Sequence, residues 1–356
     1  NKRIKFIMAY TTINKSTDYF NTKLYTGNGA TQSITGVNHA PSLTWIKNRT
    51  DTSNHNLYDA VRGGDGSNFY FLKSNTNVVQ GTNTGCLKTL DSDGFTLGDG
   101  NEVNGSGDSM VSWNWKAGTT SSISGGSITP SSVSINTTSG FGIYKWTGTG
   151  STGTIAHGLG AVPKFMFIKN LSSAESWRTY HHSLGNATSL KLNTSDASFS
   201  DTGAFNSTTP TSTLFTVGNS DSTNKSGDSF VAYVFAEITG YSKFGKYYGT
   251  NSNDGAFLYT GFKPAVMILK RLDVQANSWL ILDNKRDPDN LVENYLFPSE
   301  TDAEGDGGGS AGWDFLSNGI KQRNTYGSAN QASNYLFIAF AEAPLVGSNN
   351  VPCTAR

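Results

Sequence analysis

The feature that most limits how this chain can fold is a strand-like phrase that it spells three times. The phrase reads GDSMVSWNWKAG at residues 107–118, GDSFVAYVFAEI at 227–238 and SNYLFIAFAEAP at 333–344. The copies lie about 120 and about 105 residues apart, which exceeds the period of solenoid repeats and suits independent β-domains. We therefore predict three mutually similar repeats.

Other blocks recur in the same order at the same offsets. Each repeat has a proline that is followed by an apolar strand and a lysine. A segment of nine residues, with the same place in each repeat, comes next. A second matching segment, which contains a large apolar residue, then precedes the closing phrase. The matching residues and segments are Pro41, Pro163 and Pro264; Lys47, Lys169 and Lys270; HNLYDAVRG (55–63), WRTYHHSLG (177–185) and WLILDNKRD (279–287); and Phe95, Phe215 and Ile320.

Composition and periodicity favour strands throughout. Charged residues make up 15% of the chain, against roughly 25% in a typical soluble protein, and the chain holds 40 glycines. Glycines and β-branched residues interrupt every stretch with a helical period, and turn residues separate short apolar or alternating segments. We predict an all-β fold of three tandem, mutually similar antiparallel β-sandwich repeats of jelly-roll-like form.

The predicted boundaries follow the repeats and a change in composition between the first two. They are an N-terminal segment (1–18), β-repeat 1 (19–118), a Ser/Thr/Gly linker (119–139), β-repeat 2 (140–240), β-repeat 3 (241–344) and a C-terminal tail (345–356).

Alternate residues of the closing phrase point to opposite faces of its strand. One face is large and apolar in every copy, so we expect it to be the core: Val111, Trp113 and Trp115; Val231, Tyr233 and Phe235; Leu336, Ile338 and Phe340. On the other face Met110, Ser112 and Asn114 suit solvent in the first copy. The later copies are apolar there as well, at Phe230, Ala232, Val234 and Ala236 and at Tyr335, Phe337, Ala339 and Ala341. A neighbouring repeat or another subunit is expected to cover these faces, and we predict a homo-oligomer.

Motifs that carry chemistry are missing from the sequence. It contains no phosphate-binding loop of the Gly-x-x-x-x-Gly-Lys-Ser/Thr type and no His-Glu-x-x-His. We predict no enzymatic activity, no catalytic residues, no cofactor and no metal site, and leave ligand-binding residues unassigned. Cys86 and Cys353 are too few for a disulfide framework or a zinc site, so we expect a buried thiol and a tail thiol.

Histidines and acidic clusters are the titratable groups that could form a site. The histidines are His39, His55, His157, His181 and His182, and His181 falls where the other repeats place Asp59 and Asp283. We expect a structural role for it at the surface. Asp302, Glu304, Asp306 and Gly307 loosely resemble a calcium loop, but its twelfth position is Trp313 rather than glutamate. Solvated turns are the preferred interpretation.

Tryptophans offer another possible function, because exposed aromatic rings can stack on sugars. Trp45, Trp113 and Trp115 occupy positions that are apolar in every repeat, which favours the core. Trp177 and Trp279 recur near a loop that looks exposed, where repeat 1 has His55, so their role stays open.

Charge and hydropathy exclude some classes of partner. The chain holds 27 basic and 27 acidic residues, so it lacks the positive field of a nucleic-acid or anionic-membrane binder. No run approaches the roughly 18 apolar residues of a membrane helix. The start, NKRIKFIMAY, has no hydrophobic core of a signal peptide, and Met8 looks like a better natural start, so residues 1–7 are expected to lie outside the native protein.

Several segments together resemble a family of large structural proteins encoded in phages of marine bacteria, which are often described as tail-fibre-like. The most specific are AHGLGAVPKFMFIKN (156–170) and DNKRDPDN (283–290), and the resemblance extends over nearly the whole chain from Met8. The resemblance implies that the protein is a virion component and that the predicted oligomer has three-fold symmetry. The family has no defined catalytic residues that could be assigned to this sequence.

Three functions are consistent with these features. The first is a phage virion structural protein, such as a tail fibre, spike or capsid appendage, that mediates host-surface glycan attachment or particle assembly. The second is a secreted carbohydrate-binding module, and the third is a virion-associated glycan-degrading enzyme. We prefer the first, with other virion proteins and host glycans as partners, no nucleic acid and no membrane insertion. Its location would be the virion, after synthesis in the host cytoplasm without a signal peptide.

Overall fold

The computed structural model describes residues 10–119, 122–307, 311–347 and 351–354. Residues 1–7 and Met8, on which a prediction was made, lie outside this part of the chain. Strands make up nearly all of the regular structure, and the named strands pair antiparallel. The prediction of an all-β antiparallel fold is confirmed.

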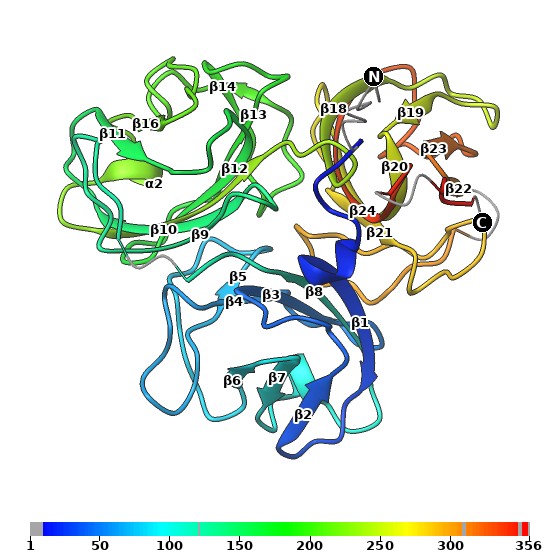
Figure 1. Ribbon diagram of the computed structural model, residues 1–356, viewed down its shortest axis with the longest axis horizontal. Coiled ribbons are helices and arrows are strands. Elements are labelled where there is room, and N and C mark those ends of the chain that lie inside the picture. The colour runs from blue at the N-terminus through cyan, green and yellow to red at the C-terminus, as the bar shows by residue number, and fades with distance from the viewer. Residues whose placement is uncertain (1–9, 120–121, 308–310, 348–350, 355–356) are drawn as a thin grey trace, which may run out of the picture.

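Figure 1 shows three lobes arranged around a common centre. Lobe 1 (residues 20–115) contains β1 (Phe20–Thr26), β2 (Gln32–Thr35), β3 (Leu43–Asn48), β4 (Asn56–Asp59), β5 (Leu72–Lys73), β6 (Leu87–Asp91), β7 (Gly94–Leu97), the short helix α1 (Asn101–Asn104) and β8 (Ser109–Trp115). A 3₁₀ turn, η1 (Ser16–Asp18), precedes it.

The other two lobes follow along the chain. Lobe 2 (residues 132–236) contains β9 (Ser132–Asn136), β10 (Phe141–Thr147), β11 (Gly153–Ala156), β12 (Pro163–Asn170), β13 (Arg178–His181), β14 (Thr188–Ser189), β15 (Phe199–Ser200), β16 (Leu214–Val217), α2 (Asp221–Asn224) and β17 (Ser229–Ala236). Lobe 3 (residues 242–344) contains β18 (Ser242–Tyr248), β19 (Phe257–Tyr259), β20 (Phe262–Arg271), β21 (Leu280–Asp283), β22 (Trp313–Leu316), β23 (Gly319–Gln322) and β24 (Asn334–Pro344).

The main sheets of the three lobes share one strand order. The orders are β1-β8-β3-β4, β10-β17-β12-β13 and β18-β24-β20-β21. The three closing phrases form β8, β17 and β24, so each lies in the interior of its sheet. Smaller sheets face them, with the orders β2-β7-β6, β11-β16 and β19-β23-β22. The division into three repeats and the jelly-roll topology stay predictions.

The closing strands meet at the centre of the molecule. Trp115, Phe235 and Phe340 pack against one another there, with ring centroids 6.4 Å apart for Trp115–Phe235, 5.6 Å for Trp115–Phe340 and 5.6 Å for Phe235–Phe340. All three side chains are buried. The space left among the central rings is about 10 Å³, which is hardly enough for one water molecule. The three lobes therefore share one packed core.

This arrangement corrects the predicted faces of the closing strands. The face with Val111, Trp113 and Trp115 lies in the central core that all lobes share, rather than in a core private to one repeat. In lobe 2 the opposite face, with Phe230 and Val234, packs in a separate core within that lobe. Met110, Ser112 and Asn114 are buried as well, so the expectation that they face solvent was wrong.

The predicted linker between the first two repeats is partly a strand. Its residues 132–136 form β9, which pairs with β10 and adds a fifth strand to the sheet of lobe 2. Val133 and Ile135 alternate with serines, and both are buried with Ile128 in the core of lobe 2. A short strand with two apolar residues is easily hidden in a Ser/Thr-rich stretch, because composition alone marks such a stretch as a linker.

Candidate functional site

A buried ion pair lies at the contact between lobe 1 and lobe 2. Asp59, at the end of β4, accepts hydrogen bonds from the backbone and the guanidinium of Arg62. The Tyr233 hydroxyl of lobe 2 donates to the same carboxylate at 2.6 Å. The side chains of Asp59 and Arg62 are fully buried. The carboxylate thus has donors on every side and serves to join two lobes.

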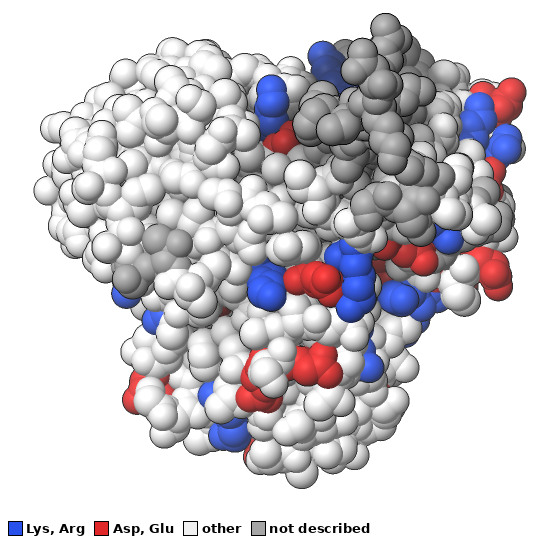
Figure 2. Space-filling view, viewed as in Figure 1, with Lys and Arg blue, Asp and Glu red and all other residues white. Residues whose placement is uncertain are grey.

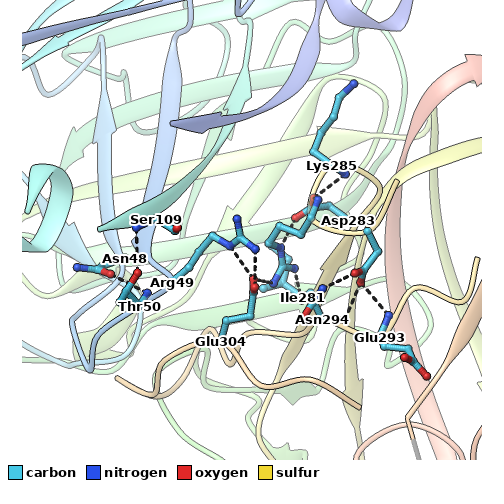
Figure 3. Close-up of polar contacts among 12 residues, drawn as sticks. Asn48, Arg49, Thr50, Ser109, Ile281, Asp283, Lys285, Glu293, Asn294 and Glu304 are labelled. Atoms are coloured by element: carbon cyan, nitrogen blue, oxygen red, sulfur yellow. Dashed lines mark hydrogen bonds and ion pairs between the residues drawn. The ribbon is translucent and has the colours of Figure 1, made fainter. Parts of the chain in front are cut away.

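Lobe 3 is joined to lobe 1 by the matching residues. Asp283, at the end of β21, binds the guanidinium of Arg286 at 2.7 Å and accepts from Trp113 Nε1 of lobe 1 at 3.0 Å. Glu304 then bridges Arg286 and Arg49, at 2.9 Å and 2.6 Å. Figure 3 shows Arg49 reaching across to Glu304, beside Asp283. We call Asp59–Arg62 and Asp283–Arg286 the two Asp–Arg clamps.

Histidines replace the clamp where lobe 2 meets lobe 3. His181 ends β13, as Asp59 ends β4, and its Nδ1 accepts from the Ser183 amide as the aspartates accept from theirs. His182 Nε2 lies 2.9 Å from the carbonyl oxygen of Phe244 in lobe 3. His181 is fully buried, so its predicted surface position was wrong. Burial, together with the neighbouring His182, lowers the pKa of His181 to about 3.

Three buried lysines donate hydrogen bonds to backbone carbonyls near the contacts between lobes. Lys47, Lys169 and Lys270 are the lysines of the repeated strand, and burial lowers the pKa of each to about 8. Such an amine could act as a nucleophile if a substrate reached it. Here each ammonium donates to backbone carbonyls, and in two cases one carbonyl belongs to the preceding lobe, at Asn77 and Ser195. These lysines therefore hold the backbone together.

The tryptophans are also structural. Every tryptophan of the chain is buried, including Trp177 and Trp279, whose role the sequence leaves open. Trp177 Nε1 donates to the Lys73 carbonyl of lobe 1 at 2.9 Å, and Trp279 Nε1 donates to the Lys191 carbonyl of lobe 2 at 3.0 Å. Sugar stacking by tryptophan is therefore ruled out for this fold.

Neither the acidic loop nor the cysteines form a metal site or a disulfide in the described part of the chain. Glu304 of the loosely calcium-like segment is committed to two arginines, while Asp302 and Asp306 point outward as exposed residues. Cys86 is buried and Cys353 is half-buried, and both thiols are free. Among the residues that the structure describes, no group of three His, Cys, Asp or Glu side chains is placed to hold a metal ion.

An open pocket in lobe 1 has a volume of about 350 Å³. Its wall combines carboxylates, amides, a thiol and aromatic rings: Asn56, Tyr58, Phe71, Asn83, Gly85, Cys86, Asp99, Gly100, Asn101, Glu102 and Val103. The carboxylate of Glu102 is held by Asn54, Asn56 and Lys73, at 2.6, 3.2 and 3.1 Å. A second hollow of similar volume adjoins it and shares Asp99. We call the first hollow the lobe 1 pocket.

Larger side chains stand at the matching position of the other lobes. Asn56 pairs with Ile46 in the sheet, and Arg178 and Leu280 take the same register in lobes 2 and 3. Arg178 lies over the Phe199 ring and forms an ion pair with Asp201 at 2.9 Å, and Leu280 is buried. The short Asn56 leaves room for the pocket in lobe 1. Sequence reasoning missed this site, because its residues come from four separate segments.

A different kind of surface lies on lobe 3. Phe257 and Tyr259 of β19 are 46% and 54% exposed, whereas Leu258 between them is buried. They are aromatic side chains that the protein leaves open to solvent at the edge of a sheet. No helix in the described ranges is long and apolar enough to cross a membrane.

Comparison with known proteins places the chain in a family. Neither the curated proteins nor the solved structures contain a match. One family model, a domain of unknown function named DUF7483, matches residues 15–344. This match covers all three lobes and far more than half of the chain. The chain therefore belongs to the DUF7483 family.

Proposed function

We propose that this protein is a non-catalytic attachment protein that binds a carbohydrate in the lobe 1 pocket, as a structural component of a phage virion. The lobe 1 pocket is the observation that carries the binding role. Its amides and carboxylates offer both donors and acceptors to sugar hydroxyls, and Phe71 offers an apolar face. The virion role, the location on the particle and the partners rest on the sequence resemblance alone.

The burial and the contacts of the charged groups favour a binding role over a catalytic one. The buried carboxylates and guanidinium groups of the Asp–Arg clamps and the buried Lys169 and Lys270 are used in contacts between lobes, and Lys47 is buried against carbonyls of its own lobe. Self-association belongs to the proposal through the resemblance. The apolar faces that first suggested it, around Phe230 and Tyr335, are covered within the same chain.

A glycan-degrading enzyme is the second candidate, because Asp99 and Glu102 bring two carboxylates to one pocket. Glycoside hydrolysis needs one carboxyl group as a proton donor. Both oxygens of Glu102 accept hydrogen bonds instead, from two amides and the Lys73 ammonium. This arrangement favours attachment without cleavage.

The test begins with a glycan array and continues with calorimetry on the strongest ligand. The variant Asp99→Asn/Glu102→Ser gives lobe 1 the residues that lobe 2 has at Asn219 and Ser222, and we expect it to weaken binding at least tenfold. Asp221→Asn, an exposed change on α2, is the matched control and should bind normally. Unchanged binding by the double variant would contradict the proposal, and release of reducing ends that Glu102→Ser abolishes would favour the enzyme.

A further inference from the structure

The exposed aromatic residues of lobe 3 lie on an edge strand. β19 pairs only with β23 in its sheet, so one side of the strand is open. Phe257 and Tyr259 alternate with the buried Leu258 and therefore point outward together. Tyr10, which is 36% exposed, joins them, because its hydroxyl donates to the Gly261 carbonyl at 2.7 Å. We call Tyr10, Phe257 and Tyr259 the lobe 3 aromatic surface.

A glycine fixes the orientation of one of these rings. Gly319 lies opposite Tyr259 in the ladder, two residues before Lys321, which pairs with Phe257. A methyl group added at Gly319 would lie 2.5 Å from the Phe257 ring, so the ring covers the glycine closely. The ring is therefore held against the sheet, with its other face open. A ring that is already immobilised loses little entropy when it stacks on a ligand.

Charges of both signs surround the aromatic surface and balance one another. Asp254 pairs with Lys321 at 2.7 Å and with Arg323 at 3.6 Å, and Arg323 pairs with Asp314 at 2.7 Å. Lys321 lies on β23, which is next to β19, and Asp314 lies on β22, the third strand of the same sheet. Figure 2 shows acidic and basic side chains gathered at the outer edge of lobe 3, whereas the visible face of lobe 2 is almost without charge.

We propose that the lobe 3 aromatic surface binds a neutral polysaccharide by stacking on the faces of its sugar rings. The two acidic and two basic groups cancel, so they favour a ligand without net charge while offering hydrogen bonds to hydroxyl groups. About half of each ring is open, which gives roughly 200 Å² for Phe257 and Tyr259 together. A stable protein interface needs about 800 Å² from each partner. The exposed area therefore suits a sugar chain better than a second copy of this chain.

This site is independent of the lobe 1 pocket and of the function proposed for it. The two are on different lobes and share no residue. The probes are three neutral polymers, namely laminarin, hydroxyethyl cellulose and galactomannan, each cast into a native gel that retards a protein that binds it. We expect retardation by at least one polymer and a loss of at least tenfold in affinity for Phe257→Ala/Tyr259→Ala.

Control variants show whether these two rings, rather than exposed aromatic residues in general, bind the polymer. Tyr248→Ala removes an aromatic residue that is 59% exposed on another strand and should bind normally. Phe257→Tyr should also bind, because it keeps an aromatic ring, and Asp99→Asn/Glu102→Ser should bind because it alters only the lobe 1 pocket. The proposal is overturned if no polymer retards the protein or if the double variant binds unchanged. It is equally overturned if sedimentation shows a self-association that Phe257→Ala/Tyr259→Ala abolishes, since a second copy would then occupy the surface.

Discussion

The Tyr233 hydroxyl of lobe 2 donates a hydrogen bond to the buried carboxylate of Asp59 in lobe 1, at 2.6 Å. Trp113 of lobe 1 stands in the same relation to Asp283 of lobe 3, at 3.0 Å. Tyr233 and Trp113 occupy the same register in their closing strands. In both cases a buried carboxylate at the end of a strand accepts a hydrogen bond from a side chain of another lobe, and these contacts can be tested separately from the apolar core.

Tyr233→Phe removes this donor without changing the shape of the side chain. We expect a loss of about 1.5–3 kcal/mol in the free energy of unfolding, because the acceptor is a charged group that stays buried. Urea denaturation measures the loss. Tyr144→Phe is the matched control, since the hydroxyl of Tyr144 donates to the neutral carbonyl of His157 within lobe 2. The control should lose about 1 kcal/mol, and equal losses would contradict the role given to Asp59.

The Asp–Arg clamp of lobe 1 can be converted into the pair that lobe 2 carries. Arg62→Leu leaves Asp59 charged and buried, and we expect it to cost about 3–5 kcal/mol. Asp59→His/Arg62→Leu reproduces His181 and Leu184, and should cost at least ~1 kcal/mol less, because it leaves no unpaired charge. Denaturant unfolding of both variants gives the comparison. If the double variant is as unstable as Arg62→Leu, the unpaired charge of Asp59 is not the cause of the loss in the free energy of unfolding.

Phe235→Ala opens the centre at which the three lobes meet. The side chain is almost fully buried and contacts both Trp115 and Phe340, so the expected cost is about 3–5 kcal/mol. Val162→Ala, at a position that is 36% exposed, should change stability by less than about 0.5 kcal/mol. A loss below about 1 kcal/mol for Phe235→Ala would mean that the lobes are held together elsewhere.

Acid should destabilise the protein well before its carboxylates are protonated. Burial lowers the pKa of His39 to about 4 and, together with neighbouring His182, that of His181 to about 3. Below pH 6.5 the unfolded chain takes up protons that these folded imidazoles do not, so the free energy of unfolding falls as the pH falls. Each of the two contributes a loss of about 2 kcal/mol between pH 7 and pH 5.

Urea unfolding at pH 7, 6 and 5 measures this dependence. His181→Asn keeps an acceptor for the Ser183 amide and removes the titrating group. Its stability should fall by about 2 kcal/mol less than that of the wild type over the same range. The attribution to His181 is wrong if the two pH profiles run parallel.

The fold class could be predicted because its signals are local. Alternation along the closing phrases and turn residues between short apolar runs mark strands wherever they occur. Which face of a closing strand points to the central core shared by the lobes could not be predicted, because both faces are buried. Ser112 and Asn114 suit solvent by residue type, yet the Asn114 amide bonds the Asn21 carbonyl and Ser112 inside the sheet. Such hydrogen bonds reduce the cost of burying a polar residue.

The sites were less predictable than the fold. The residues of the lobe 1 pocket lie in four segments that only the folded chain brings together, and Asn56 matters because it is small where other lobes have Arg178 and Leu280. The lobe 3 aromatic surface has a sequence signal that could have been used. Alternate residues of a strand point to opposite faces. Because Leu258 points into the core, Phe257 and Tyr259 on either side of it point to solvent.

The closed arrangement of the lobes has a consequence for the order of the chain. A hydrogen bond from Trp113 to Asp283 joins lobe 1 to lobe 3, as one from Tyr233 to Asp59 joins lobe 2 to lobe 1, although no peptide link connects lobes 1 and 3 directly. Tyr10 bonds the Gly261 carbonyl, and the neighbouring Phe262 pairs with Pro344. The two ends of the folded region thus lie beside the same turn. A circular permutant that starts with lobe 2, joins residue 344 to residue 10 by a short linker and ends with lobe 1 should form the same ring.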